Sequence, residues 1–152
     1  MAEFTGERVI PGEVDTDLWN EHVARYLFAG RLARQKRVLD IACGTGYGTS
    51  ELASMAATAV GIDRAPEAIR YAQSHYRRPH LTYLQASAHE LPFPDSSFDL
   101  VTAFEVIEHL ADWQQLLVEA RRLLRPGGQF VVSTPNKLYY AQSREQIGRA
   151  HV

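Results

Sequence analysis

Short apolar segments alternate regularly with longer amphipathic segments along this sequence, and this alternation limits the folds that the chain can adopt. The short segments are rich in β-branched and aromatic residues, which is typical of buried strands. They lie at residues 38–41, 59–63, 81–85, 98–104 and 129–134. The longer segments carry apolar residues at helical spacing. They lie at residues 17–34, 49–57, 67–76 and from 112 to the turn at 126–128. Asp112 and Gln115 have the spacing of a capping box at the start of the last of these helices.

This alternation predicts an α/β fold, in which right-handed crossovers build a doubly wound, mostly parallel sheet with helices on both faces. Ligands of such sheets bind beyond the carboxyl ends of the strands, where the strand order reverses. We expect the sheet to lack the last two strands of a complete doubly wound fold, because the sequence ends soon after its fifth strand. That fifth strand would then be an exposed edge.

The length of 152 residues predicts one main domain with a single core. We expect an N-terminal lid segment and helix over residues 1–35, the ligand-binding sheet over 36–136, and a truncated tail over 137–152. The last part of this tail, 147–152, matches the translation of a sequencing-adapter read. We therefore treat it as an artefact and leave it out of the fold and site predictions.

Charge and cysteine content exclude several classes of partner. Lysine and arginine total 16 against 18 aspartates and glutamates, which gives no electrostatic reason to expect nucleic acid or an anionic membrane. No apolar run is long enough to cross a membrane, and the start of the chain lacks the apolar core of a signal peptide. Cys43 is the single cysteine, which indicates a reducing, cytoplasmic compartment. We expect no metal site, because the histidines lack ligand spacing.

A glycine-rich loop follows the first strand-like segment. Gly44, Gly46 and Gly48 would let the backbone turn tightly and approach a ligand closely. The dinucleotide-binding fingerprint requires a third glycine three positions after the second. Tyr47 or Thr49 occupies that position in the two possible registers. A nicotinamide-dependent oxidoreductase is therefore a disfavoured alternative.

Acidic residues close the first two strands. Asp40 would repel a pyrophosphate but would attract the ammonium of S-adenosylmethionine, a cationic ligand without phosphate, directly or through water. Asp63 has the position typical of an acid that accepts hydrogen bonds from both ribose hydroxyls. The alternative for Asp63 is a helix cap or a solvated loop acid.

Four segments together resemble the class I S-adenosylmethionine-dependent methyltransferases of the small-molecule type. They lie at residues 38–46, 61–63, 91–101 and 124–128. The resemblance covers roughly residues 36–136 and implies a Rossmann-like domain that binds S-adenosyl-L-methionine. It also implies an enzyme that moves the methyl group from the sulfonium to a small-molecule acceptor by in-line displacement. The protein mainly has to position the acceptor and exclude water.

The resemblance also implies a set of cofactor-binding positions around the methionine part, the ribose and the adenine. They are Asp40, Ala42, Gly44, Gly46, Asp63, Arg64, Ser87, Ala88 and Glu105, with His89 beside the adenine. Two of them depart from the family pattern. Ala42 stands where glycine is commonest, and we expect its methyl group to be tolerated. Ser87 stands where an aspartate often accepts from the adenine amino group.

The N-terminal segments 5–12 and 20–26 resemble a subset of these enzymes in which this region lies over the cofactor cleft. The resemblance makes Arg8, His22 and Tyr26 candidate lid or substrate contacts. The alternative is that His22 and Tyr26, one helical turn apart, simply pack on the sheet.

His109, in the loop after the fourth strand, is the candidate general base if the acceptor arrives protonated. The alternative is that His109 only orients a neighbour such as Glu105. Catalysis by Cys43 is disfavoured, since the family often has a small buried cysteine there. A fragment that binds the cofactor without turnover is the main alternative function, and the sequence does not predict the acceptor or the oligomeric state.

Overall fold

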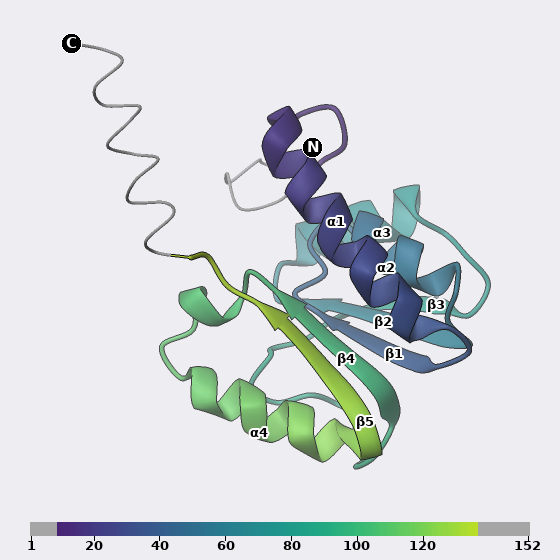
Figure 1. The fold of residues 1–152 in the computed structure, drawn as a ribbon, viewed down its shortest axis with the longest axis vertical. Helices are drawn as coiled ribbons and strands as arrows, with labels where there is room; N and C mark the ends of the chain where they lie inside the picture. Colours follow the sequence, from purple (N-terminus) through teal and green to yellow (C-terminus); the bar gives the residue numbers. More distant parts are fainter. Residues whose placement is uncertain (1–8, 137–152) are drawn as a thin grey trace.

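The computed structural model describes residues 9–136, which form a five-stranded parallel sheet flanked by helices (Figure 1). The strands are β1 (Arg37–Ile41), β2 (Thr58–Asp63), β3 (Leu81–Gln85), β4 (Phe98–Phe104) and β5 (Leu124–Ser133). The helices are α1 (Thr16–Ala33), α2 (Tyr47–Ala53), α3 (Pro66–His75), the 3₁₀ turn η1 (Ile107–His109) and α4 (Trp113–Leu123). The strand order is β3-β2-β1-β4-β5, and every neighbouring pair is parallel. The predicted fold class is confirmed.

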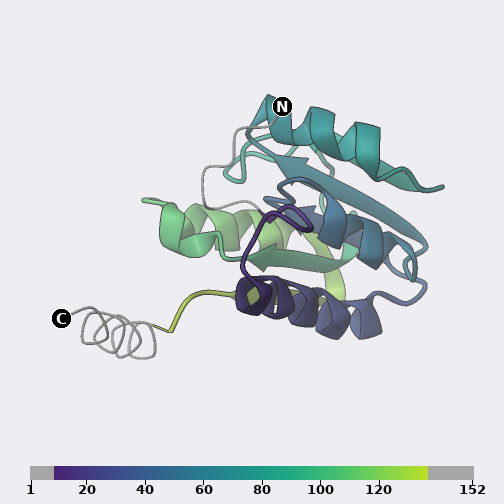
Figure 2. The same cartoon turned by 90° about the horizontal axis from the view of Figure 1, so that it is seen from above.

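The alternation of side chains along β1 explains how the helices divide between the two faces of the sheet. Leu39 and Ile41 are buried beneath α4 and the loop between β3 and β4. Val38 points to the opposite face and is buried against α1 and α2. Figure 2 shows α2 between α1 and α3 on that face. Because both faces are covered, four of the five residues of β1 are buried.

The boundary between α4 and β5 differs from the prediction that this helix continues to Pro126. The helix ends at Leu123, and β5 begins at Leu124. Arg125 precedes a proline, and such a residue is driven from the helical to the extended conformation. Residues 125–128 lie in an irregularity of the pairing between β4 and β5.

The predicted capping box is also wrong. Asp112 is at the N-cap of α4, but its side chain makes no capping hydrogen bond. The side chain of Gln115 donates instead to the carbonyl of His89 at 3.4 Å.

The described sheet ends at β5, which has a neighbour on one side only. This matches the exposed edge expected from the sequence, and Val132 of β5 is 43% exposed. Of the described helices, none has the length and apolar character needed to cross a membrane. Arg8 and the tail 137–152, with its last part 147–152, lie outside the described residues.

Candidate functional site

The candidate site lies at the carboxyl ends of the central strands. Ile41 at the end of β1 pairs with Ile62 of β2 on one side and with Ala103 of β4 on the other. The strand order reverses between β1 and β4, which is where ligands of doubly wound sheets bind. The glycine loop, Asp63 and Glu105 follow these strand ends, so the fold brings three of the predicted regions to one edge.

The glycine loop depends on backbone conformations that other residues avoid. Gly44 and Gly46 have φ values of +57° and +92°. A Cβ atom on Gly46 would lie 2.6 Å from the Cβ of Ala72 and 2.9 Å from the hydroxyl of Tyr83. The Tyr83 hydroxyl donates to the Gly46 carbonyl at 3.0 Å. The loop is therefore held against α3 and β3 in a conformation that only glycine fits at Gly46.

Two residues other than glycine also take the left-handed conformation at this edge. Ala42, directly after β1, has a φ of +58°, and Glu105, directly after β4, has a φ of +54°. Such strain costs about 1–2 kcal/mol for an L residue and clusters at functional sites. Gln35, His80 and Ser96 take the same conformation elsewhere, so strain alone does not identify the edge between β1 and β4 as functional.

Ala42→Gly should raise the free energy of unfolding by about 0.5–1 kcal/mol, because relief of left-handed strain exceeds the entropy that glycine adds to the unfolded chain. Urea denaturation measures the effect. Ala24→Gly, at an exposed position of α1, is the matched control and should lower the free energy of unfolding by about 0.5–1 kcal/mol. If Ala42→Gly lowers the free energy of unfolding as much as Ala24→Gly does, the backbone at Ala42 is not strained.

Asp63 is held in place by two backbone amides. Its Oδ2 accepts from the Gly44 N–H, and its Oδ1 accepts from the Ala65 N–H, each at 2.9 Å. A carboxylate has about four lone-pair sites, so each oxygen keeps capacity for a further donor. The bond to Ala65, just before α3, resembles the helix-cap alternative, while the bond to Gly44 ties the carboxylate to the glycine loop.

Asp40 is fully buried between the sheet and the helices on its α1 face. Its carboxylate accepts from the hydroxyls of Tyr26 at 3.0 Å, Thr49 at 2.7 Å and Thr102 at 2.7 Å. Burial raises the pKa of Asp40 to about 6, and the three hydroxyls oppose that shift. This arrangement presents no exposed carboxylate to an ammonium, so Asp40 joins α1, α2 and β4 rather than lining the cleft directly.

Glu105 forms an ion pair that the sequence did not suggest. Its Oε1 lies 2.6 Å from the guanidinium of Arg25, which also contacts Glu21 at 3.4 Å. Burial raises the pKa of Glu105, Arg25 opposes the shift, and the neighbouring Glu108 adds to it. The second oxygen of Glu105 is buried and has no partner among the described residues. The only sequence signal for Arg25 was its helical spacing from Glu21.

The placement of His22 and Tyr26 corresponds to the packing alternative. Tyr26 is 5% exposed, and its ring meets Phe104 edge to face with 5.0 Å between centroids. His22 packs on Tyr26 with its centroid 5.0 Å away. Burial and the nearby Arg25 lower the pKa of His22 to about 4, so the ring is neutral near pH 7.

The other predicted positions are distributed along the same edge. Arg64 is exposed next to Asp63, and Ser87 is exposed just after β3. The Ser87 hydroxyl accepts from the His89 N–H at 3.3 Å. His109 ends η1 on the β4 side, with 47% of its side chain exposed and its Nε2 3.7 Å from Glu108.

Cys43 is 5% exposed, and burial raises the pKa of its thiol, with the charges of Asp40 and Asp63 adding to the shift. The thiol therefore stays protonated near neutral pH. Residues 9–136 contain no group of three side chains placed to bind a metal ion.

Comparison with known proteins places this geometry in a family. A model described as a methyltransferase domain matches residues 39–132. A protein of Mycolicibacterium smegmatis, named "Probable S-adenosylmethionine-dependent methyltransferase", is 37% identical over 143 residues, which are 93% of this chain and 55% of that protein. A ubiquinone biosynthesis O-methyltransferase of Azorhizobium caulinodans is 38% identical over 133 residues, covering 86% of this chain and 51% of the relative.

Solved structures of other proteins share this fold. An S-adenosylmethionine-dependent methyltransferase from Mesorhizobium loti has a TM-score of 0.67 at 26% identity, over 76% of this chain and 55% of that one. The PH0226 protein from Pyrococcus horikoshii has a TM-score of 0.74 at 25% identity, over 91% of this chain and 68% of that one. The chain spans about half the length of the curated relatives it matches. As the sequence motifs predicted, the chain belongs to the methyltransferase-domain family of class I.

Proposed function

We propose that this chain is the S-adenosylmethionine-binding part of a methyltransferase that acts on a small molecule. The observation that carries the proposal is the carboxylate of Asp63, which is fixed by the Gly44 amide at 2.9 Å and keeps free lone pairs. Asp63 lies beside the glycine loop at the end of β2, and the other predicted cofactor contacts follow the ends of β1, β3 and β4. The family membership supports the same cofactor.

The order of residues along the sheet edge fits an extended adenosine derivative. Ser87, Ala88 and Arg64 would border the adenine next to β3 and β2. Asp63 would hold the ribose, and the backbone from Ala42 to Gly46 would hold the methionine part. Glu105, after β4, lies at the far end of this series, where its unpartnered buried oxygen offers an acceptor for the cofactor ammonium. Asp40 would act indirectly, through the helices that it joins to β1.

When bound, the cofactor would supply a methyl group on a sulfonium, and the leaving thioether is neutral. The chain's own task is to position the acceptor and exclude water. Residues 9–15 would contribute to this, and the Val9 carbonyl, which accepts from the Thr45 hydroxyl at 2.7 Å, holds their start beside the glycine loop. His109, at the β4 end of the site, would take a proton from an acceptor that arrives protonated.

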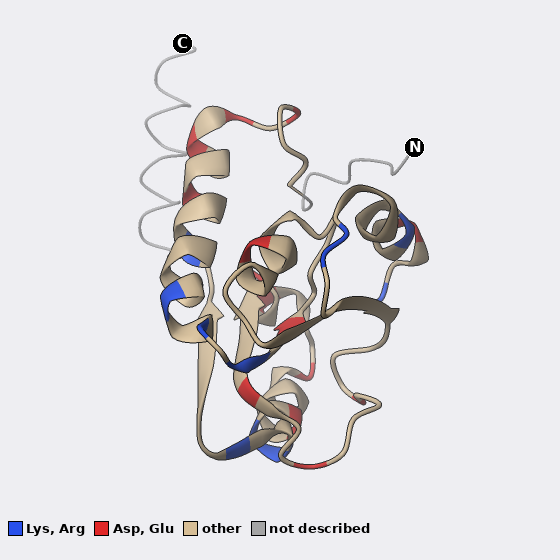
Figure 3. Ribbon diagram, turned by 90° about the vertical axis from the view of Figure 1, so that its right-hand side faces the viewer, with Lys and Arg blue, Asp and Glu red and all other residues tan. Residues whose placement is uncertain are grey.

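The nature of the acceptor is part of the proposal. The relatives named ubiquinone biosynthesis O-methyltransferases favour a small molecule with a hydroxyl group. Figure 3 shows acidic and basic positions interspersed on the side of the described residues that it draws. The 16 basic and 18 acidic residues of the sequence give no electrostatic reason to propose nucleic acid or an anionic membrane as partner. A reducing, cytoplasmic compartment is proposed from the single buried Cys43.

A cofactor-binding fragment without turnover is the second candidate function. It is favoured by the position of β5 at the edge of the described sheet and by the share of the relatives that the chain spans. The fold alone does not decide between the two functions. A methyl-transfer assay on a set of small molecules that carry a hydroxyl group, run beside a binding titration with S-adenosylhomocysteine, separates catalysis from binding.

Asp63→Ala should weaken binding of S-adenosylhomocysteine by about 1–3 kcal/mol, roughly fivefold to 150-fold, because both ribose hydroxyls lose their acceptor. Calorimetric titration measures the affinity, and NAD should not bind the unaltered chain. Asp112→Ala is the matched control, since Asp112 is exposed and makes no capping bond. Unchanged affinity in Asp63→Ala would refute the ribose contact, and tight NAD binding would refute the proposed cofactor.

A further inference from the structure

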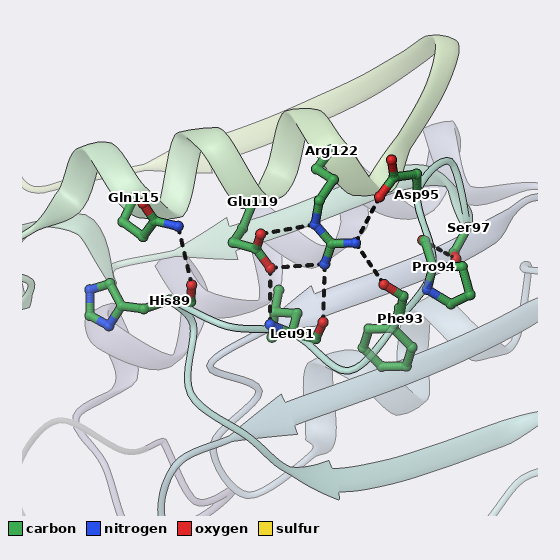
Figure 4. A network of polar contacts seen from close by, with 9 residues as sticks. All are labelled: His89, Leu91, Phe93, Pro94, Asp95, Ser97, Gln115, Glu119 and Arg122. Carbon is green, nitrogen blue, oxygen red and sulfur yellow. Dashed lines mark hydrogen bonds and ion pairs between the residues drawn. The ribbon is translucent and has the colours of Figure 1, made fainter.

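The loop between β3 and β4, residues 86–97, is tied to α4 by three side chains (Figure 4). They are Gln115, Glu119 and Arg122, which share one face of the helix at intervals of four and three residues. All three reach the backbone of the loop. The loop contains only turns, bends and an isolated bridge, so its backbone groups depend on such partners.

Arg122 makes the largest number of these contacts. Its guanidinium donates to the carbonyls of Phe93 at 2.7 Å and Leu91 at 3.0 Å. It also pairs with the carboxylates of Asp95 at 3.0 Å and Glu119 at 2.9 Å. The planar fork of arginine presents five donors in fixed directions, which a lysine ammonium does not reproduce. The middle of the loop is therefore oriented by the geometry of this one guanidinium.

Glu119 completes the connection from the helix side. It is 7% exposed, and its Oε2 accepts from the Leu91 N–H at 2.9 Å and from Arg122 at 3.0 Å. The hydrogen bond to Arg122 lowers the pKa of Glu119, so the carboxylate is ionised near neutral pH. Leu91 thus has both its N–H and its carbonyl bonded to α4 through this one pair of side chains.

The same loop forms the adenine side of the candidate site. It begins at Ala86, whose N–H donates to the Asp63 carbonyl at 3.1 Å. Ser87 and Ala88 follow, and Gln115 holds the next residue, His89, through its carbonyl. Residues 87–88 therefore lie between two fixed points, one at the end of β2 and one on α4. A change in the α4 contacts is expected to move Ser87 and Ala88 relative to Asp63.

We propose that Glu119 and Arg122 are positioning residues that set the adenine side of the cofactor site from α4. They act through the loop backbone. The inference rests on the proposed function, because it assumes that Ser87 and Ala88 border the adenine. It goes beyond that function by assigning adenine recognition to a helix outside the set of cofactor-binding positions.

The test compares two ligands that differ only in the base. S-adenosylhomocysteine carries an amino group on the base, and S-inosylhomocysteine carries a carbonyl there. Calorimetric titration of the unaltered chain with both ligands gives an affinity ratio that reports adenine recognition. Arg122→Lys keeps the charge but loses the fork, and it should weaken S-adenosylhomocysteine about tenfold while lowering the ratio by a similar factor. Arg121→Lys, the same change at the neighbouring exposed position, should alter neither value.

Melting temperatures of the variants separate positioning from general stability. A lower melting temperature of Arg122→Lys with an unchanged affinity ratio would overturn the proposal, as would an unchanged affinity for S-adenosylhomocysteine. Should Arg122→Lys fail to fold, Glu119→Gln keeps an acceptor for the Leu91 N–H, loses the ion pair with Arg122 and should lower the ratio without unfolding the chain. An unchanged ratio in that variant overturns the proposal as well. Failure of the unaltered chain to bind S-adenosylhomocysteine would instead refute the proposed function.

Discussion

Gly48→Ala should destabilise the fold by at least about 3 kcal/mol, although the change adds a single methyl group to a helix. A Cβ atom at Gly48 would lie 2.1 Å from two atoms of the Tyr26 ring. The ring has no room to retreat, because Tyr26 donates to the buried Asp40 at 3.0 Å and packs against Phe104. The clash must therefore separate α1 from α2 or break the hydrogen bond to Asp40.

Thermal and urea unfolding of Gly48→Ala and of its control variants measure this effect. Gly30→Ala is the matched control, since Gly30 is also a helical glycine but has nothing within 4 Å of an added Cβ. It should raise the free energy of unfolding by about 0.5–1 kcal/mol. Tyr26→Leu removes the clashing ring. Gly48→Ala should therefore destabilise the Tyr26→Leu protein much less than it destabilises the unaltered chain. A penalty that persists in that background would show that Tyr26 is not its cause.

The glycine loop was recognisable from the sequence, but the side chains that require glycine at two of its positions were not. The sequence assigned Gly44, Gly46 and Gly48 to close approach of a ligand. In the structure, Gly48 makes room for Tyr26, and Gly46 makes room for Ala72 and the ring of Tyr83. These partners are distant along the chain, and no local pattern reveals them.

The strands and the edge that carries the site were predictable for a different reason. Short runs of apolar and β-branched residues are a local property of the sequence, and the carboxyl-end rule is a general property of parallel sheets. They placed Asp63 beside the glycine loop and Glu105 beyond β4. The pairing of Arg25 with Glu105 depends instead on how α1 packs across the sheet. The loop contacts of Arg122 depend likewise on tertiary packing that the sequence does not encode locally.

Asp40 illustrates the same limit of sequence patterns. Its place at the end of β1 predicted an attraction for the cofactor ammonium, directly or through water, but an acid at a strand tip can equally serve the packing of the fold. The deciding fact is that α1 and α2 cover this face of β1 and supply two of the hydroxyl donors. Asp40 is buried and bonded to three hydroxyls, which predicts a role in holding the fold together.

Asp40→Ala should therefore lower the free energy of unfolding by about 4 kcal/mol, because three buried hydroxyls lose their common acceptor and a cavity forms. The donors belong to Tyr26, Thr49 and Thr102, so the loss should loosen α1, α2 and β4 together. Urea unfolding measures the effect, and Asp112→Ala is the exposed control with little change expected. A loss below about 1 kcal/mol would contradict the structural role of Asp40.

Asp40→Asn isolates the charge of this residue from its shape. The folded state raises the pKa of Asp40 from 3.8 to about 6, because burial disfavours the carboxylate and the charge of Asp63 adds to the shift. The folded form consequently binds the proton more tightly than the unfolded form, and this contribution to stability is full below pH 3.8 and is lost as the pH rises through 6. Between pH 5 and 7.5, the unaltered chain should lose about 1 kcal/mol relative to Asp40→Asn. Taking the difference between the two proteins cancels the titration of groups such as His22. A difference that stays constant across this range would mean that Asp40 is already ionised in the folded protein at pH 5.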